Sequence, residues 1–450
     1  MAEAPQYVGI SERAQTPLNA KSSTGQWRER GALGVNATSL VTINVLESGS
    51  SSNPLDPRAL VCAQLWRVGE GGANPHFVSE SLLMDTTGYP NYTFGPMHLP
   101  MLVRIDDFRF AIVGYAAPNY PIRKIIVAVA TISGDEIIWG APVDIYEDDG
   151  TGSPTKSSEP LLSSYLYREF AVELVAANTI AVVAPIDPGD DNAVIARLFT
   201  VAGDVPTAQG VWQVGLRVPY DGDVYNFWTD SAFDGTTMVI VDDSYTRTYA
   251  IGLTFNGGTI SFIERAQVYD HGVSTSFRKL IAVSPGKFGC LVYEAQGNRL
   301  RAFSINADLT STLVGTFDDP NGLFFSDYGP QASTKLRTPN GGILIHGDDS
   351  TYTLGACYEF RFNGEEPAVM LSGFSGPEPF ANQGLFGLMG QRSFIEMLPG
   401  TNVAAFFESS NEFQSPFRLF SRVWSWTVEP ALQAVTLMPS RVMFTPPRRG

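Results

Sequence analysis

Short runs of apolar and β-branched residues recur along the whole chain, separated by clusters of Gly, Pro, Asn, Asp and Ser. The pattern is clearest between Phe277 and Phe317, where breaks fall at 284–286, 296–297 and 306–308. Val, Ile, Phe, Tyr and Leu favour strands, and the residues at the breaks favour tight turns. This stretch therefore predicts a four-stranded antiparallel meander, with strands at 279–283, 287–295, 298–305 and 310–317.

The same unit can be placed seven times from Trp27 onward. The third strand of each copy alternates apolar and polar residues, and successive copies are about 50 to 70 residues apart, which matches a kelch-sized propeller blade with insertions. Several second strands are continuous apolar runs, as expected for a strand buried on both faces. Third strands are expected at 62–68, 126–132, 195–201, 249–255, 300–305, 355–360 and 418–426. Second strands are expected at 39–45, 108–115, 179–186, 236–241, 287–295, 342–346 and 402–407.

Two β-sandwiches would also give many short strands, but they would not repeat the four strand types in one order. No helix of convincing length and periodicity is found, which argues against an α/β enzyme fold. The sequence therefore predicts an all-β, seven-bladed β-propeller of four-stranded antiparallel blades at 26–440. Residues 1–25 are expected to form an extended N-terminal arm. A last outer strand is expected at 431–438, and the Pro/Arg tail at 441–450 either pairs at a sheet edge or, as its prolines favour, contacts a neighbour.

Charge limits the partners. The chain has 30 Lys plus Arg against 46 Asp plus Glu, so its net charge of -16 disfavours tight binding to nucleic acid or anionic lipid. No secretory signature is present at the start, and no apolar run approaches the length of a membrane span. Three cysteines, Cys62, Cys290 and Cys357, each lie in an apolar run and are expected to be buried free thiols.

Acidic pairs recur in the expected turns, and the segment 187–192 (Asp-Pro-Gly-Asp-Asp-Asn) is the best candidate for a calcium site. None has the EF-hand spacing, and Asp also caps backbone N–H groups in turns, so turn chemistry is favoured and no metal or cofactor is expected. A glycosidase would need two carboxyl groups across a cleft. The innermost strands offer few acids, with Glu173 in 170–175 and Glu396 in 395–398, and the Asp-box pattern of sialidases is not found.

Arginines recur at or near the expected innermost strands, and they could bind an acidic partner or pair with the Asp turns. These are Arg28 or Arg30, Arg104, Arg168, Arg278, Arg337 and Arg392. Their register varies by about three residues between copies, so scattered surface positions are favoured. The candidate subunit contacts are Arg28 and Arg30, just after the arm, and Arg441, Arg448 and Arg449 in the tail. No catalytic residue is assigned, because the four His lack metal-ligand spacing and no nucleophile elbow or phosphate-binding glycine motif is present.

With its N-terminal arm, its richness in Ala, Ser, Thr and Gly and its loosely matched blades, the chain resembles the propeller proteins of tailed bacteriophage virions, such as tail nozzle or knob proteins. This resemblance implies a non-enzymatic structural component, made in the host cytoplasm and docked in the virion as a homo-oligomer beside other structural proteins. The alternative is a glycan-binding or glycan-cleaving propeller used in host recognition, with Tyr89, Tyr92, Tyr120, Tyr225, Trp228 and Tyr328 as candidate stacking residues.

Overall fold

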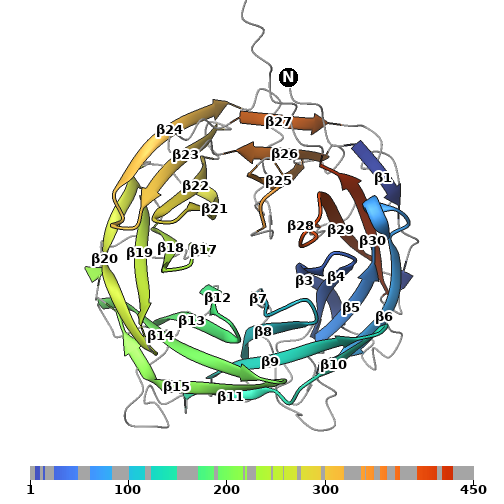
Figure 1. Cartoon of the computed structure of the whole chain (residues 1–450), viewed down its shortest axis with the longest axis horizontal. Helices are drawn as coiled ribbons and strands as arrows, with labels where there is room; N and C mark the ends of the chain where they lie inside the picture. Colours follow the sequence, from blue (N-terminus) through green and yellow to red (C-terminus); the bar gives the residue numbers. More distant parts are fainter. Residues whose placement is uncertain are drawn as a thin grey trace, which may run out of the picture.

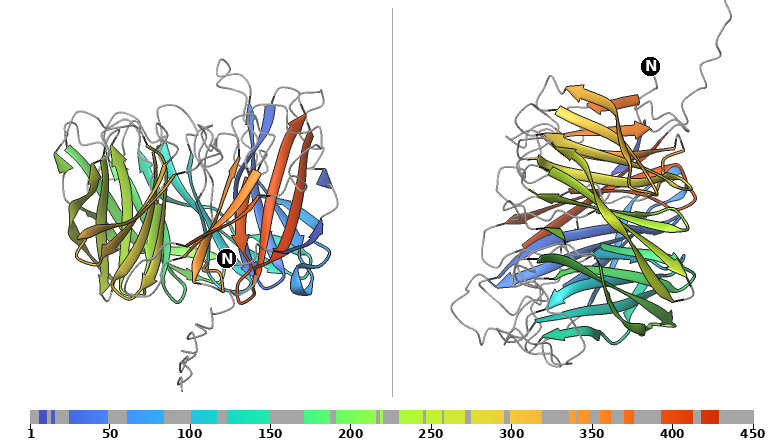
Figure 2. Two further views of the ribbon diagram at one scale, coloured as in Figure 1. Left: turned by 90° about the horizontal axis from the view of Figure 1, so that it is seen from above. Right: turned by 90° about the vertical axis from the view of Figure 1, so that its left-hand side faces the viewer.

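A computed structural model gives the fold of the chain. It describes residues 6–10, 14–15, 25–48, 61–83, 101–116, 123–148, 171–186, 191–215, 218–219, 230–244, 247–256, 258–270, 275–294, 299–318, 336–339, 341–348, 355–361, 370–375, 393–412 and 418–428. These residues form seven antiparallel sheets that follow one another around a ring (Figure 1). Seen from the side, the ring is a shallow cylinder whose strands run between its two faces (Figure 2). The predicted all-β propeller fold is confirmed.

We number the sheets in chain order from the one that begins with β3. Sheet one contains β3 (Gly25–Asn36), β4 (Ser39–Ser48), β5 (Val61–Arg67) and β6 (His76–Leu82). Sheet two contains β7 (Met101–Arg104), β8 (Arg109–Ala116), β9 (Arg123–Ser133) and β10 (Glu136–Trp139), with β11 (Val143–Asp148) also paired to β9. Sheet three contains β12 (Ala171–Ala176), β13 (Thr179–Ile186), β14 (Asp191–Ala202) and β15 (Val205–Val214), with β16 (Val218–Pro219) also paired to β14.

The remaining sheets complete the ring. Sheet four contains β17 (Asp230–Phe233), β18 (Thr237–Ser244), β19 (Arg247–Asn256) and β20 (Thr259–Asp270). Sheet five contains β21 (Thr275–Ser284), β22 (Lys287–Glu294), β23 (Arg299–Asn306) and β24 (Ser311–Asp318). Sheet six contains β25 (Gly342–Asp348), β26 (Gly355–Arg361) and β27 (Met370–Ser375). Sheet seven contains β28 (Ser393–Met397), β29 (Val403–Glu412) and β30 (Arg418–Thr427).

The outer strand of sheet seven comes from the other end of the chain. β1 (Gln6–Ile10) pairs with β30 from Gln6 opposite Thr427 to Ile10 opposite Trp424, and β2 (Ala14–Gln15) pairs further along β30. The segment predicted to be an arm thus contributes two strands to the last sheet. The outer strand expected at 431–438 and the tail at 441–450 lie outside the described residues.

Strand β13 shows why these sequences form buried second strands. Ile180, Val182 and Ala184 face sheet two, whereas Ala181 and Val183 face sheet four, and all five side chains are buried. A continuous apolar run is required because alternate side chains of one strand point to opposite faces, each covered by a neighbouring sheet. The prediction made from this run is confirmed.

Helical structure is almost absent from the described residues, which contain one 3-10 turn, η1 (Glu70–Gly72). No helix in this part of the chain is long and apolar enough to cross a membrane. Both cysteines whose side chains are described, Cys62 and Cys290, are buried thiols outside any disulfide, as predicted. The side chain of Cys357 lies outside the described residues.

Candidate functional site

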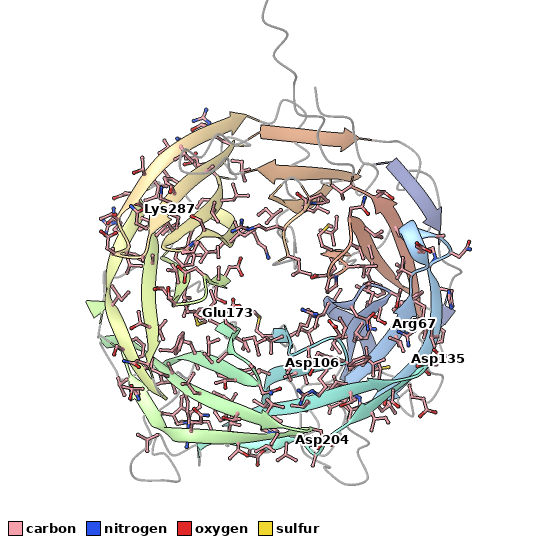
Figure 3. The ribbon with its side chains drawn as sticks, viewed as in Figure 1. Arg67, Asp106, Asp135, Glu173, Asp204 and Lys287 are labelled. Carbon is pink, nitrogen blue, oxygen red and sulfur yellow. The ribbon has the colours of Figure 1, made fainter. Side chains whose placement is uncertain are left out.

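Polar side chains gather on the innermost strands of three consecutive sheets. Glu173 lies on β12, Asp230 and Ser231 on β17, and Lys279 on β21. Figure 3 shows Glu173 on the inner side of the ring, near its axis. The first strand of each sheet lies nearest the axis (Figure 1), so these residues occupy the position where three sheets come closest together. We call Glu173, Asp230, Ser231 and Lys279 the axial cluster.

The first contact of the axial cluster joins sheets three and four. Ala171 and Val175 pack toward sheet four, and strand alternation places Glu173 on the same face of β12. The hydroxyl of Ser231 donates to Glu173 Oε1 at 2.7 Å, with Ser231 fully buried and Glu173 8% exposed. A buried carboxyl is tolerated where it accepts such hydrogen bonds.

The second contact joins sheets four and five. Asp230 Oδ2 lies 3.7 Å from Lys279 Nζ and accepts the backbone N–H of Leu280 at 2.8 Å, while its Oδ1 accepts the N–H of Ser231 at 2.9 Å. Both charged side chains are largely removed from water, at 5% exposure for Lys279 and 13% for Asp230. A pair of this kind interacts more strongly than a surface salt bridge, because water screens it less.

The axial cluster combines two carboxyl groups, a hydroxyl and an ammonium group. Carboxyl and hydroxyl oxygens accept hydrogen bonds from sugar hydroxyls, and an ammonium group donates to sugar oxygens. Asp230 and Ser231 are adjacent on β17, so their side chains point to opposite faces of that strand, and the carboxyl groups of Glu173 and Asp230 lie on either side of it. Cleavage of a glycosidic bond also uses two carboxyl groups, one on each side of the bond. Glu396 on β28 is a further buried acid on an innermost strand, at 2% exposure.

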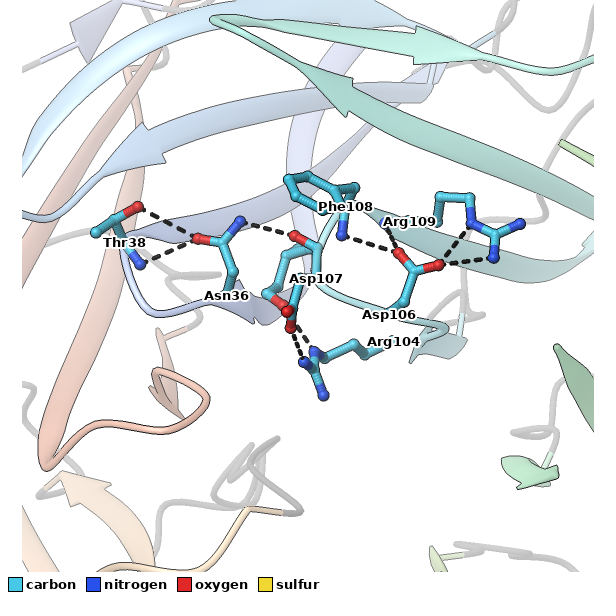
Figure 4. A network of polar contacts seen from close by, with 8 residues as sticks. Asn36, Thr38, Arg104, Asp106, Asp107, Phe108 and Arg109 are labelled. Carbon is cyan, nitrogen blue, oxygen red and sulfur yellow. Dashed lines mark hydrogen bonds and ion pairs between the residues drawn. The ribbon is translucent and has the colours of Figure 1, made fainter. Parts of the chain in front are cut away.

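Acids and arginines at the turn of sheet two have a different role, shown in Figure 4. Asp106 Oδ1 accepts the backbone N–H groups of Phe108 and Arg109 at 2.9 and 2.8 Å, and its Oδ2 pairs with the Arg109 guanidinium at 2.6 Å. These bonds hold the pKa of Asp106 below its usual value against the opposing effect of burial. The predicted turn chemistry is therefore confirmed at this position.

The same turn ties sheet two to its neighbours. Arg109 donates to Asn178 Oδ1 at 2.5 Å and to the Gly203 carbonyl at 2.7 Å, both in sheet three. Arg104 donates to the Val35 carbonyl of sheet one at 2.7 Å and pairs with Asp107.

In the same way, Arg337 donates to the Ala282 carbonyl of sheet five. The two recurring arginines whose side chains are described, Arg104 and Arg337, thus link consecutive sheets, and Arg104 pairs with the turn residue Asp107, which was one of the alternatives to scattered surface positions.

The other candidates from the sequence are not brought together. Arg28 and Arg30 lie on β3, with their side chains outside the described residues, and Arg441, Arg448 and Arg449 lie wholly outside them, so these subunit contacts stay predictions. Most of the segment 187–192 is also outside the described residues. Within the part that is described, no three His, Cys, Asp or Glu side chains gather as a metal ion would require.

Sequence reasoning found Glu173 but missed the rest of the axial cluster. No innermost strand was assigned before the second strand at 236–241, although Asp230-Ser231-Ala232-Phe233 precedes an Asp-Gly turn and forms β17. The innermost strand expected at 279–283 contains no acid, but its Lys279 meets Asp230. The contact between Asp230 and Lys279 joins two sheets. The hydrophobic periodicity of one sheet carries no information about contacts with the next sheet.

Comparisons with known proteins give similarity to solved structures alone. No family model matches the chain, and no curated protein matches it. The periplasmic gluconolactonase of Pseudomonas aeruginosa aligns with a TM-score of 0.43 and 13% identity over 77% of this chain and 84% of its own. A neuraminidase-like protein from a flat-faced bat isolate aligns with a TM-score of 0.35 and 10% identity over 96% and 99%. A mutant NanB sialidase of Streptococcus pneumoniae aligns with a TM-score of 0.39 and 9% identity over 90% and 94%.

These comparisons correct one prediction. The expectation that the chain has no enzymatic activity is corrected at the level of the fold: the solved structures of similar fold include proteins named as a gluconolactonase and a sialidase, so the propeller fold gives no ground for excluding an enzyme. None of the three is named as a phage protein, and the virion location and homo-oligomeric assembly stay predictions.

Proposed function

We propose that this propeller binds a glycan at its axis and cleaves it with Glu173 and Asp230. The observation that supports this function most is the axial cluster, in which carboxyl groups from β12 and β17 are held by Ser231 and Lys279. Both acids come from rigid strands, which position side chains better than loops do. Glu173 lies on the inner side of the ring (Figure 3), and the other three residues lie on the innermost strands of the next two sheets.

The reaction would follow the general chemistry of glycoside hydrolysis. One carboxyl group donates a proton to the oxygen of the leaving sugar, and the other carboxylate assists the attack at the anomeric carbon, so that water is added across the broken bond. Lys279 and Ser231 would hold the two acids in place and donate to sugar oxygens. Proton transfer by a positioned group contributes roughly 100- to 10,000-fold to a rate.

The experiment measures glycan-array binding and the release of reducing ends from a polysaccharide panel by the full chain. Glu173→Gln and Asp230→Asn keep the shape of each side chain and remove its acid, so each is expected to lower turnover at least about 100-fold while binding persists. Glu136→Gln makes the same change at an exposed position of β10 and is expected to have no effect. Thermal unfolding of each variant separates lost chemistry from lost folding.

Two outcomes would contradict the proposal. A wild-type chain that binds no glycan and releases no reducing ends would exclude it. So would variants that bind and turn over glycan like Glu136→Gln, because the axial carboxyl groups would then take no part.

A further inference from the structure

The turn between β7 and β8 of sheet two carries an exposed aromatic ring. Phe108 is 62% exposed, and it is the one aromatic residue among the exposed large apolar side chains of the described part of the chain. The turn consists of Ile105, Asp106, Asp107 and Phe108, and Ile105 is the member that is buried in the core. Core packing therefore does not account for a phenylalanine at position 108.

The equivalent turns of five other sheets show that the turn itself does not require an aromatic residue. The residues between the first and second strands of sheets one, three, four, five and seven are 37–38, 177–178, 234–236, 285–286 and 398–402. These turns contain Ala, Thr, Asn, Asp, Gly, Pro and one leucine, Leu398, which is buried. Small residues and residues that cap backbone groups suit a tight turn. Because neither turn chemistry nor packing explains Phe108, its exposed ring indicates contact with another molecule.

The backbone that presents this ring is held in place from several sides. The N–H of Phe108 donates to Asp106 Oδ1 at 2.9 Å, and its carbonyl accepts the N–H of Ile132 on β9 at 2.7 Å. Asn36 of sheet one donates from Nδ2 to the Asp107 carbonyl at 2.8 Å (Figure 4). Binding by a preorganised group costs less conformational entropy than binding by a loose loop. The turn therefore offers the ring in a fixed position.

An ion pair lies on the same turn. The guanidinium of Arg104, on β7, pairs with Oδ1 of Asp107, the residue before Phe108 (Figure 4). The Arg104 side chain is 32% exposed and the Asp107 side chain 67% exposed. Adjacent Cα atoms are about 3.8 Å apart, so the ring and the carboxylate lie within the span of a short oligosaccharide. We call Arg104, Asp107 and Phe108 the turn subsite.

The chemistry of these three side chains selects the ligand. The face of an aromatic ring packs on the apolar C–H face of a sugar ring, and a few polar groups then fix the orientation. Sugar hydroxyls both donate and accept hydrogen bonds, so they can bond to both members of the ion pair. A protein surface fits less well, because the cores of protein interfaces are depleted in acidic residues. We propose that the turn subsite binds a sugar unit, which stacks on Phe108 and forms hydrogen bonds with Asp107 and Arg104.

This inference rests on the proposed function and adds a second point of contact for the glycan. β7, the strand of Arg104, is the innermost strand of sheet two (Figure 1). Its Val103 shares a core cluster with Val172 of β12, the strand that carries Glu173. The turn subsite thus belongs to the sheet next to the one that supplies Glu173. It holds sugar units other than those that are cleaved, which adds binding energy remote from the reacting bond.

The experiment screens the full chain on an array of neutral and acidic oligosaccharides and then titrates the one that binds most tightly. Phe108→Ala is expected to raise Kd about tenfold, which corresponds to about 1.4 kcal/mol. Phe108→Trp keeps an aromatic face and is expected to bind within about twofold of the wild type. Ile138→Ala is the control, because it removes a 50% exposed apolar side chain from the outer strand β10, and its Kd should not change.

The proposal is overturned if Phe108→Ala binds the oligosaccharide as tightly as Ile138→Ala, or if the wild type binds none. It is also overturned if Phe108→Ala alters only the oligomeric state measured by light scattering, because the ring would then serve a protein contact. The proposed function fails separately if Glu173→Gln cleaves the glycan at the wild-type rate. In that case a weakened affinity of Phe108→Ala would still support the turn subsite.

Discussion

The Asp234 side chain connects two sheets at one turn, and its removal should destabilise the ring by an amount that can be worked out. Asp234 Oδ1 accepts the N–H groups of Thr236 and Thr237, each at 2.8 Å, and Oδ2 accepts the N–H of Gly286 in sheet five at 2.6 Å. Losing an Asp that caps backbone N–H groups costs about 1 kcal/mol. Losing the hydrogen bond to Gly286 in the next sheet adds about 1 kcal/mol. This value is below the usual one for a hydrogen bond to a charged group, because Asp234 is partly exposed to water. Asp234→Ala should therefore lose about 2 kcal/mol.

The assay is thermal unfolding at neutral pH. For 450 residues unfolding as one unit, 2 kcal/mol corresponds to a fall in Tm of about 2 °C. Asp308→Ala is the matched control, because Asp308 accepts the N–H and hydroxyl of Thr310 in a similar turn, and both bonds stay within sheet five. The Tm of Asp308→Ala should fall by less than the Tm of Asp234→Ala. Equal falls would refute the reasoning that the bond to Gly286 stabilises the ring.

The stabilisation that Asp234 provides should depend on pH in one definite direction. Burial opposes ionisation of Asp234, but hydrogen bonds from Thr237, Gly286 and Thr236 outweigh it and lower the pKa. The stabilisation is therefore present above the pKa of an unfolded Asp and is lost as the pH falls through the lower folded value. The Tm difference between wild type and Asp234→Ala should shrink in acid.

Three further predictions concern the interface between sheets seven and one, where the ring closes. Glu80 has its folded pKa raised to about 7, so its contribution to stability should fall as the pH rises from about 4.5 to 7, and Glu80→Gln should remove this slope in denaturant unfolding. Gly34→Ala would place a methyl group against the Met397 carbonyl and the Pro399 ring, and is expected to lose about 1 to 3 kcal/mol in the same assay. Trp66→Leu should lower the free energy of unfolding by about 3 kcal/mol, because it leaves a cavity and removes the edge-to-face contacts of Trp66 with Phe77 and Phe407. An unchanged free energy of unfolding would contradict the observed packing between sheets seven and one.

Much of the ring could be predicted from the sequence, because strand pairing within a sheet leaves a periodic pattern. The second strands at 39–45 and 179–186 and the third strands at 62–68 and 195–201 match β4, β13, β5 and β14 closely. The apolar run of β13 predicts burial on both faces, and that burial is observed. These features are local in sequence.

Features that depend on contacts between distant segments could not be predicted. The segment 6–10 lies in a stretch rich in Pro, Gly and Ser, and its pairing with β30 depends on residues more than 400 positions away. Asp230 and Lys279 look unrelated in the sequence, but they meet because β17 and β21 are the innermost strands of consecutive sheets. The recurring Asp and Arg residues were recognised, and Arg109 and Asp106 show that the turns also serve as ties between sheets.

The most direct measurement of the central claim is a structure of Glu173→Gln with an oligosaccharide taken from the panel. The account predicts a sugar at the axis, with oxygens within hydrogen-bonding distance of Asp230 and of the Gln side chain at position 173. A sugar bound only on the outer strands of the ring, with the axial cluster unchanged, would contradict it.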